Sequence, residues 1–228
     1  MQPSGTLSIV ATPIGNLEDI TLRALRTLKE ADEILCEDTR VTKKLLTHYD
    51  IHGKVTRCDA EKEIACAEQV SAWLQEGKRV AYVSDAGTPA ISDPGARLVR
   101  HVRMHVPLAT IEAIPGPSSI TSALSIAGLD TREFTFLGFV PHKKGRETFF
   151  KQLADYPHPV LFFESTHRII KTLTSLREQY GSSRVILARE LTKKFEEIME
   201  GTPDELLVLL SEKKERQKGE FVVMVTRD

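Results

Sequence analysis

The sequence predicts a protein of two α/β domains, and three observations lead to this prediction. Short apolar runs, typical of buried strands, alternate with amphipathic stretches of helical period almost to the end of the chain. Turns rich in glycine and proline follow several of these runs. A segment rich in proline and glycine interrupts the alternation near the middle. We therefore expect residues 1–114 to form an N-terminal α/β domain and residues 115–228 a C-terminal one, with a cleft between them.

The first half of the chain alternates strands with helices. Strands are predicted at residues 7–10, 34–36 and 80–83, and the alternation favours a largely parallel sheet covered by helices. One helix begins near Thr21, a second ends at Gly77, and a third follows Asp93, its expected N-cap, with Pro94 in the first turn. Apolar residues at helical spacing mark the buried faces of these helices: Leu22, Leu25 and Leu28; Ile64, Ala67, Val70 and Leu74; Val99, Val102 and Val106.

The second half opens with residues 114–119, where two prolines and a glycine can continue neither a strand nor a helix. Ser118 or Ser119 can cap the helix of small residues that follows. The remaining elements are predicted from the same patterns. Strands are expected near residues 134–139, 160–163, 185–188 and 221–225, and helices near residues 148–156, 166–180 and 203–213.

The composition excludes several classes of protein. Of the 228 residues, 41% are hydrophobic and 28% charged, as in ordinary globular proteins. No apolar run approaches the roughly 20 residues that span a bilayer, and no basic region or cleavage site of a signal peptide precedes the first strand. The formal net charge of −1 argues against a protein that coats nucleic acid by bulk charge, but it allows local basic patches.

The cysteines indicate a reducing compartment. The chain has three, an odd number without a C-x-x-C pair, so we expect a cytoplasmic protein. His48 and His52 lie four residues apart and precede Cys58 and Cys66, but this spacing fits no standard zinc pattern. We expect no metal site.

Three turns that follow predicted strands are candidates for ligand binding: residues 12–16, 84–89 and 115–119. Ligands of open α/β sheets bind beyond the carboxyl ends of strands, and glycine lets the backbone approach a ligand closely. One such turn is more often only a tight connection, whereas three in succession favour a shared site. No dinucleotide-binding motif, P-loop or nucleophile elbow occurs in the chain.

Seven segments resemble the ribosomal RNA small subunit methyltransferase I family, part of the tetrapyrrole methylase superfamily. They occur in order along nearly the whole chain, at residues 10–21, 36–40, 83–95, 115–117, 163–168, 188–193 and 218–220. Members commonly carry a His-Asn-Glu segment after the second helix, where this chain has residues 57–63 of different sequence. Many also extend beyond the last strand, where this chain reaches Asp228.

The resemblance implies the superfamily's non-Rossmann methyltransferase fold and transfer of a methyl group from S-adenosylmethionine to the ribose 2′-oxygen of a cytidine in small-subunit (16S) ribosomal RNA. It also implies a homodimer, and a cofactor in the interdomain cleft held mostly by backbone groups. Together with the three turns, it gives these expected cofactor-binding residues: Pro13, Ile14, Gly15, Ser84, Asp85, Ala86, Gly87, Thr88, Ile91, Ser118, Ser119 and Phe163.

A ribose hydroxyl becomes a good nucleophile only when a base takes its proton or a cation lowers its pKa. Charged groups at three strand ends are candidates, and the base is not assigned among them. Each cluster can equally be an ion-pair network or a helix cap. The catalytic candidates are Glu37, Asp38 and Arg40 in one cluster and Glu190 and Lys193, with Arg189 beside them, in another. Glu164, His167 and Arg168 form the remaining cluster.

Lys143, Lys144 and Arg146 make a basic loop that could bind RNA phosphates, or that could simply be solvated. The expected partner is ribosomal RNA or the small subunit, with no membrane. Two alternatives stay open. One is a methyltransferase that acts on a tetrapyrrole, and the other is a non-catalytic ribosome-binding protein of the same fold.

Overall fold

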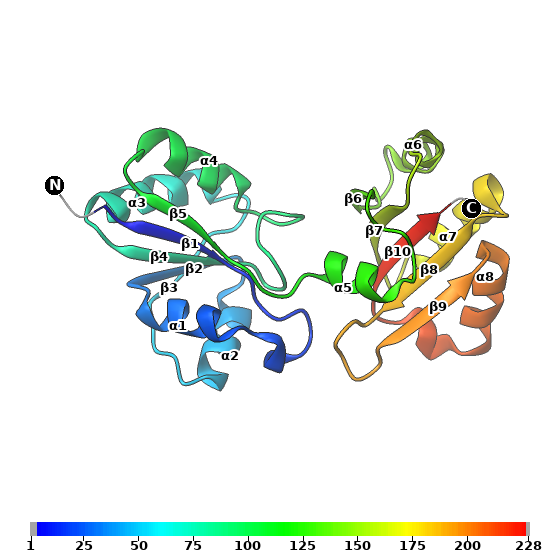
Figure 1. Cartoon of the computed structure of the whole chain (residues 1–228), viewed down its shortest axis with the longest axis horizontal. Helices are drawn as coiled ribbons and strands as arrows, with labels where there is room; N and C mark the ends of the chain where they lie inside the picture. Colours follow the sequence, from blue (N-terminus) through cyan, green and yellow to red (C-terminus); the bar gives the residue numbers. More distant parts are fainter. Residues whose placement is uncertain (1–3, 227–228) are drawn as a thin grey trace. The chain divides into compact units, whose positions relative to one another are not determined.

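The structure is a computed structural model that describes residues 4–226. The chain divides into two compact units, residues 1–118 and 119–228 (Figure 1). The predictions about a signal peptide and about the end of the chain concern residues 1–3 and 228, which lie outside the described part. Among residues 4–226, no helix is long and apolar enough to cross a membrane.

The first unit is built on a five-stranded parallel sheet of order β3-β2-β4-β1-β5 (Figure 1). Helices α1 and α2 pack on one face of the sheet, and α3 and α4 pack on the other. The strands are β1 (Thr6–Val10), β2 (Glu33–Cys36), β3 (Val55–Arg57), β4 (Arg79–Val83) and β5 (Thr110–Ile114). The helices are α1 (Leu22–Glu30), α2 (Thr39–His48), α3 (Glu63–Gln75) and α4 (Ala96–His105), with a 3-10 turn η1 at Leu17–Asp19.

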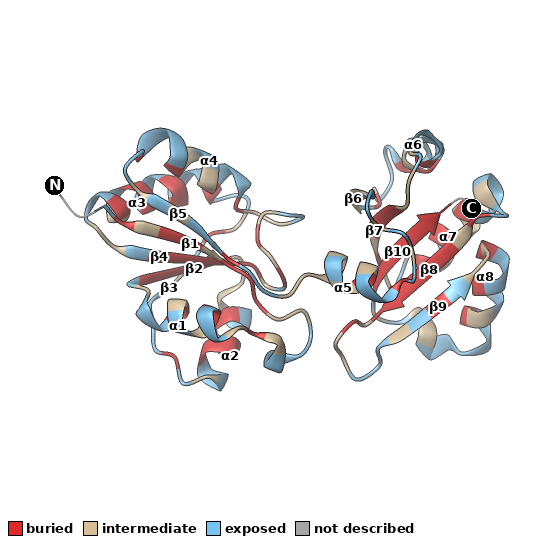
Figure 2. Ribbon diagram, in the orientation of Figure 1, coloured by how far each residue is buried: buried red, intermediate tan, exposed pale blue. Residues whose placement is uncertain are grey.

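Burial on both faces explains why β1, β2 and β4 were predictable. Most of their residues are buried, so the strands contain mainly apolar residues (Figure 2). Strands β3 and β5 were not predicted. They form the two edges of the sheet, and residues such as Arg57, Thr110 and Glu112 are exposed there, which weakens the apolar pattern.

Two details of the helix predictions were wrong. Leu22 and Ile64, in the first turns of α1 and α3, are 86% and 66% exposed, so the buried stripes begin later in each helix. Asp93 does not cap α4, because Gly95 is the N-cap residue. Instead the buried carboxylate of Glu63, on α3, accepts hydrogen bonds from the backbone N–H groups of Gly95, Arg97 and Leu98 at 3.0 to 3.2 Å. A side chain distant in sequence thus satisfies the free donors at this helix start.

The second unit has a five-stranded sheet of order β6-β7-β10-β8-β9. Only β6 and β7 pair in parallel, so this sheet is mostly antiparallel, unlike the parallel sheet that was predicted for the first half. Its strands are β6 (Thr135–Phe139), β7 (Val160–Ser165), β8 (Arg184–Arg189), β9 (Glu197–Gly201) and β10 (Glu220–Thr226). Its helices are α5 (Ser119–Ile126), α6 (Arg146–Gln152), α7 (Ile169–Tyr180) and α8 (Pro203–Glu212), with 3-10 turns η2 (Leu153–Asp155) and η3 (Lys214–Gln217).

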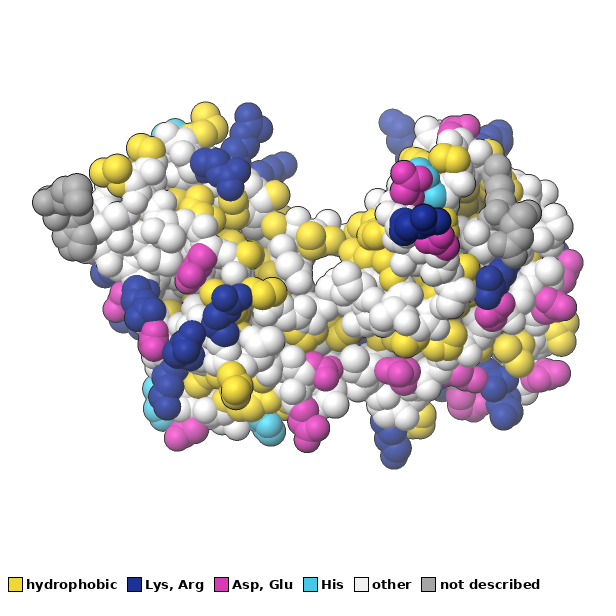
Figure 3. All heavy atoms as spheres, viewed as in Figure 1, with side chains coloured by type: hydrophobic (Ala, Val, Ile, Leu, Met, Phe, Trp, Pro, Cys, Tyr) yellow, Lys and Arg dark blue, Asp and Glu magenta, His cyan; other side chains and the backbone are white. Residues whose placement is uncertain are grey.

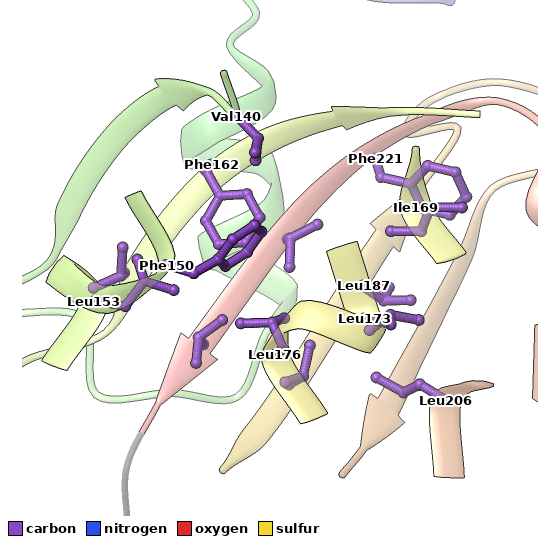
Figure 4. Packing of buried hydrophobic residues seen from close by; sticks show 14 of the residues in the cluster. Val140, Phe150, Leu153, Phe162, Ile169, Leu173, Leu176, Leu187, Leu206 and Phe221 are labelled. Atoms are coloured by element: carbon purple, nitrogen blue, oxygen red, sulfur yellow. The ribbon is translucent and has the colours of Figure 1, made fainter. Parts of the chain in front are cut away.

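One apolar core joins the second sheet to α6, α7 and α8 (Figure 4). Phe150 of α6 packs near Phe162 of β7, and Leu173 and Leu176 project from α7 into the same core. Full burial of such side chains contributes about 1.5 to 3 kcal/mol each. The core therefore fixes β7 and β8, whose ends carry the catalytic candidates Glu164 and Glu190.

Candidate functional site

The three turns predicted to bind a ligand meet at the carboxyl edge of the first sheet, beyond the adjacent strands β4, β1 and β5. The turn after β1 joins the turn after β4 by two backbone hydrogen bonds between Thr12 and Gly87, of 2.9 and 3.0 Å. The hydroxyl of Thr12 donates to the carbonyl of Ser84 at 3.1 Å. The hydroxyl of Thr88 donates to the carbonyl of Pro117 at 3.3 Å, which attaches the third turn. The three turns therefore form one backbone-lined cradle, residues 11–16, 84–89 and 115–118.

Gly87 is the glycine that this cradle requires. Its φ of +79° is a conformation that side chains disfavour. An added Cβ would lie 3.3 Å from Cγ2 of Ile14 and 3.7 Å from the carbonyl oxygen of Pro117. A larger side chain would therefore fill the space where the first and third turns come together.

Several backbone donors of the cradle remain available to a ligand. The N–H groups of Ile14, Ala86 and Thr88 donate no hydrogen bond to any residue within 4–226. Turns with free N–H groups at a strand edge suit a ligand with several polar acceptors, such as the carboxylate, hydroxyls and ring nitrogens of S-adenosylmethionine. The cradle thus offers the expected cofactor donors from the backbone rather than from side chains.

The expected cofactor-binding residues divide between the units. The first unit brings together ten of them: Pro13, Ile14, Gly15, Ser84, Asp85, Ala86, Gly87, Thr88, Ile91 and Ser118. Ser84 and Gly87 are buried and shape the turn, whereas Ile91 is 54% exposed. Ser119 and Phe163 belong to the second unit, where the Phe163 ring packs beside the rings of Phe136 and Phe139, with centroids 4.9 and 5.1 Å away.

A polar pocket lies at the ends of β2, β3 and β4 in the first unit. Its lining is Glu37, Asp38, Thr39, Arg40, Arg57, Asp59 and Asp85. The carboxylate of Asp85 accepts a hydrogen bond of 3.1 Å from the backbone N–H of Asp38, so this pocket adjoins the cradle turn that contains Asp85. Arg57 pairs with Asp59 at 2.8 Å. Arg57 is the last residue of β3 and Asp59 follows it, so predicting that strand would have placed both at the site.

Asp38 and Arg40 are occupied with each other. Asp38 is the N-cap of α2 and accepts from the backbone N–H of Arg40 at 2.8 Å, and its carboxylate pairs with the Arg40 guanidinium at 2.6 Å. The side-chain and backbone hydrogen bonds from Arg40 lower the pKa of Asp38 to about 2. A carboxylate with so low a pKa is a weak proton acceptor, so the geometry favours the capping interpretation for this pair.

Glu37 differs from its neighbours. It makes no ion pair or side-chain hydrogen bond with any of residues 4–226. Burial raises its pKa, and the nearby carboxylates of Asp85, Asp93, Asp59 and Asp38 raise it further. Burial also raises the pKa of Asp93, whose carboxylate bonds to Ser84 and the backbone of Ile91. The Asp-Pro pattern predicted Asp93 only as a helix cap and carried no signal of its position beside the cradle.

Glu190 and Lys193 form an ion pair within the connection between β8 and β9 in the second unit. The Glu190 carboxylate accepts from the Lys193 ammonium at 3.0 Å and from the backbone N–H of Glu220 at 2.9 Å. Burial raises the pKa of Glu190, but these hydrogen bonds outweigh it and the net shift is downward. Burial lowers the pKa of Lys193, but its bonds to Glu220 and Glu190 give a net upward shift, which keeps its ammonium charged. Gly219 is required there, because a Cβ would lie 2.5 Å from Cγ of Glu190.

The structure separates the three residues of the predicted basic loop. Lys143 and Lys144 are exposed between β6 and α6. Arg146 is only 7% exposed, with its Nη2 donating to the Thr172 hydroxyl at 2.8 Å and its Nη1 3.6 Å from the Glu164 carboxylate. The prediction that Arg146 contacts an RNA phosphate is therefore wrong for this structure, because the first residue of α6 turns its side chain into the core.

Glu164 is not positioned as a base either. Its buried carboxylate accepts from the backbone N–H of Ser165 at 2.7 Å, from the Thr172 hydroxyl at 2.6 Å, and pairs with Arg168 at 2.9 Å. Arg168 in turn donates to the carbonyl of Val140 at 2.7 Å, next to the basic loop. This network holds both ends of that loop. Among the described residues, no group of three or more His, Cys, Asp or Glu side chains could hold a metal ion, and the three cysteines are buried and unpaired.

Comparisons with known proteins show the family to which the chain belongs. Residues 6–207 match the family model of the Tetrapyrrole (Corrin/Porphyrin) Methylases. The chain is 45% identical over 97% of its length to a ribosomal RNA small subunit methyltransferase I of Neisseria meningitidis serogroup B, covering 76% of that protein. It is 41% identical over 97% of its length to the protein of that name from Thermotoga maritima, covering 98% of it.

The fold of the chain is similar to that of solved tetrapyrrole methyltransferases. The crystal structure of a cobalt precorrin-4 methyltransferase, a cobalamin biosynthetic enzyme, superposes with a TM-score of 0.69 at 19% identity, over 96% of this chain and 94% of that one. These comparisons confirm the α/β tetrapyrrole methylase-like fold and the family that the sequence motifs predicted. The chain therefore belongs to the tetrapyrrole methylase family and, within it, to the ribosomal RNA small subunit methyltransferase I family.

Proposed function

We propose that this S-adenosylmethionine-dependent methyltransferase modifies the ribose 2′-oxygen of a cytidine in small-subunit (16S) ribosomal RNA. The observation that carries the proposal is the first sheet's carboxyl edge, where a backbone-lined cradle adjoins a pocket with one unpaired carboxylate, that of Glu37. The similarity to relatives named ribosomal RNA small subunit methyltransferase I supports the choice of acceptor.

When bound, S-adenosylmethionine supplies a strongly electrophilic methyl group, so this chain's residues must orient the acceptor and remove its proton. In our proposal the cradle turns hold the cofactor through the N–H groups of Ile14, Ala86 and Thr88. Glu37 accepts the proton of the 2′-hydroxyl, because a raised pKa makes a carboxylate a better base and no cation neutralises it. The charged ammonium of Lys193 is a second candidate, which would lower the pKa of the hydroxyl.

Two further features belong to the proposal. Lys143 and Lys144, exposed on a loop held by Arg168, are placed to contact RNA phosphates. We also propose that the enzyme acts in the cytoplasm, where its RNA substrate is made into subunits, and that it works as a homodimer, as the family resemblance implies.

Alkaline hydrolysis of labelled RNA tests the acceptor atom. Small subunits that lack the modification are incubated with the enzyme and methyl-labelled S-adenosylmethionine. The 2′-oxygen is the nucleophile that cleaves RNA in alkali, so a methyl group on it should leave the label in an alkali-resistant dinucleotide. Label in mononucleotides would show base methylation and refute the ribose assignment. Absence of label from RNA would favour a tetrapyrrole enzyme or a non-catalytic binder instead.

Two variants test the base. Glu37→Gln should lower kcat by about 10²- to 10⁴-fold, the usual contribution of a general base, with little change in cofactor affinity. The control is Asp38→Asn, which removes a neighbouring carboxylate that already pairs with Arg40 and so should cost much less. Equal losses of kcat in both variants would contradict the assignment of Glu37.

A further inference from the structure

Helix α4 concentrates positive charge on a protein whose net charge is −1. Its ten residues include Arg97, Arg100 and Arg103, together with two histidines, and no acidic residue. Between Asp93 and Glu112 the chain has no carboxylate at all. In Figure 3, Lys and Arg side chains gather over the part of the first unit where Figure 1 places α4, without acidic side chains among them.

The three arginines of α4 are exposed, and unlike most of the described arginines they form no ion pair with a carboxylate. Within residues 4–226, ten arginines form ion pairs with carboxylates. Arg97, Arg100 and Arg103 are not among them. They recur every third residue, so they follow one another along about 9 Å of the helix axis, at a rise of 1.5 Å per residue.

The fold presents these side chains on a fixed support. Leu98 and Val102, on the opposite side of α4, are fully buried against the first sheet and α3. The carboxylate of Glu63 holds the start of the helix through three backbone N–H groups. A well-anchored helix loses little conformational entropy when its outer face binds a ligand.

We propose that the outer face of α4 binds the phosphate backbone of the RNA substrate through Arg97, Arg100 and Arg103. The inference rests on the proposed function and adds a contact surface in the first unit, separate from the lysine loop of the second. Guanidinium groups match phosphate oxygens with two parallel hydrogen bonds, and an acid-free row of them complements a polyanion. An unpaired row gains charge-assisted bonds without first breaking ion pairs.

Helix α1 provides a matched control. Arg23, Arg26 and Lys29 have the same three-residue spacing, but α1 packs on the other face of the sheet. Four carboxylates lie close to them in sequence, those of Glu18, Asp19, Glu30 and Asp32. Arg79 also pairs with Glu30, so four cations face four carboxylates and the local charge is near zero rather than strongly positive.

The test compares two triple variants, R97Q/R100Q/R103Q and R23Q/R26Q/K29Q, in binding to purified small-subunit ribosomal RNA at several salt concentrations. Each phosphate contact contributes about 0.7 to 0.9 to the slope of log K against log salt. The α4 variant should lose roughly two to three units of slope and bind at least tenfold more weakly at low salt. The α1 variant should keep the slope, and both should keep the unmodified protein's melting temperature and cofactor affinity.

The outcomes separate this inference from the proposed function. Equal slope losses in both variants, or none in the α4 variant, would overturn the inference, whether or not methyl transfer to RNA is observed. So would a loss confined to binding of vesicles of anionic lipid, which would assign the helix to a membrane surface. If the unmodified protein binds RNA with the α4-dependent slope but transfers no methyl group, the inference stands and the proposed function fails.

Discussion

Glu164 is the single carboxylate between two guanidinium groups in the second unit, and this arrangement predicts unequal effects of removing its members. The side chains of Arg146 and Arg168 are only 8% and 16% exposed, and both pair with Glu164, which is fully buried. Replacing Glu164 by Gln leaves two largely buried cations without a carboxylate. Replacing Arg146 by Met leaves the carboxylate with Arg168, the Thr172 hydroxyl and the Ser165 N–H.

The expected magnitudes differ by several kcal/mol. Removing one partner of a buried pair typically costs about 3 to 5 kcal/mol, and Glu164→Gln should fall in this range. Arg146→Met should cost less, about 1 kcal/mol, because Glu164 keeps its ion pair with Arg168 and its hydrogen bonds from Thr172 and Ser165, so no buried charge is left unpaired. Nε and Nη1 of Arg146 have no hydrogen-bond partner among the described residues, so the substitution breaks one hydrogen bond, that from Nη2 to the Thr172 hydroxyl, and the 3.6 Å ion pair of Nη1 with Glu164.

Amide hydrogen exchange in the core strands β7 and β10 measures the free energy of opening the second unit directly. Arg132→Met is the control, because Arg132 pairs with Asp130 on the surface and its loss should leave exchange unchanged. In Glu164→Gln, the amides of residues 142–146 should also exchange faster, since Arg168 would no longer be held on Val140. A larger loss in Arg146→Met than in Glu164→Gln would refute the reasoning that Glu164 is the centre of the network.

Three further predictions follow from the first unit. S-adenosylmethionine at a hundredfold excess over its Kd should stabilise the protein by about 2.7 kcal/mol and so raise its melting temperature. Gly87→Val should abolish this rise, because the valine side chain would crowd Ile14 and Pro117. A normal rise in the variant would contradict the assignment of the cradle as the cofactor site. Burial and neighbouring carboxylates raise the pKa of Glu37, so its contribution to stability falls as pH rises through that pKa. Glu37→Gln should therefore have a higher melting temperature than the unmodified protein at neutral pH. The difference should vanish at acid pH, where Glu37 is protonated in both the folded and the unfolded state. Glu63→Ala should cost about 1 to 3 kcal/mol by leaving buried N–H groups of α4 unsatisfied, and exchange of the Gly95, Arg97 and Leu98 amides should quicken more than exchange elsewhere in the unit.

The sequence by itself determined the elements whose local pattern matches their surroundings. Strands β1, β2 and β4 are buried on both faces, so each contains mainly apolar residues and can be predicted without knowing its partners. The cradle was also predictable as three turns, because proline and glycine restrict the chain locally and strand ends meet at one sheet edge. The family followed from the order of the motifs.

Only the tertiary structure decided which charged residues are available for chemistry. Arg146 and Lys144 look alike in the sequence, yet one lies in the core and the other on the surface, because the carboxylate that draws Arg146 inward belongs to a strand 18 residues away. Glu37 and Asp38 are adjacent acids, but the capping bond to Arg40 occupies Asp38. Glu37 instead lies among like charges contributed by the segments after β3 and β4 and by the turn before α4. The free backbone N–H groups at the start of α4 are satisfied by Glu63. Strands β6 to β10 pair mostly antiparallel. Apart from the local capping bond of Asp38, these outcomes depend on contacts between segments distant in sequence, and a pattern read within one segment carries no information about its eventual partner.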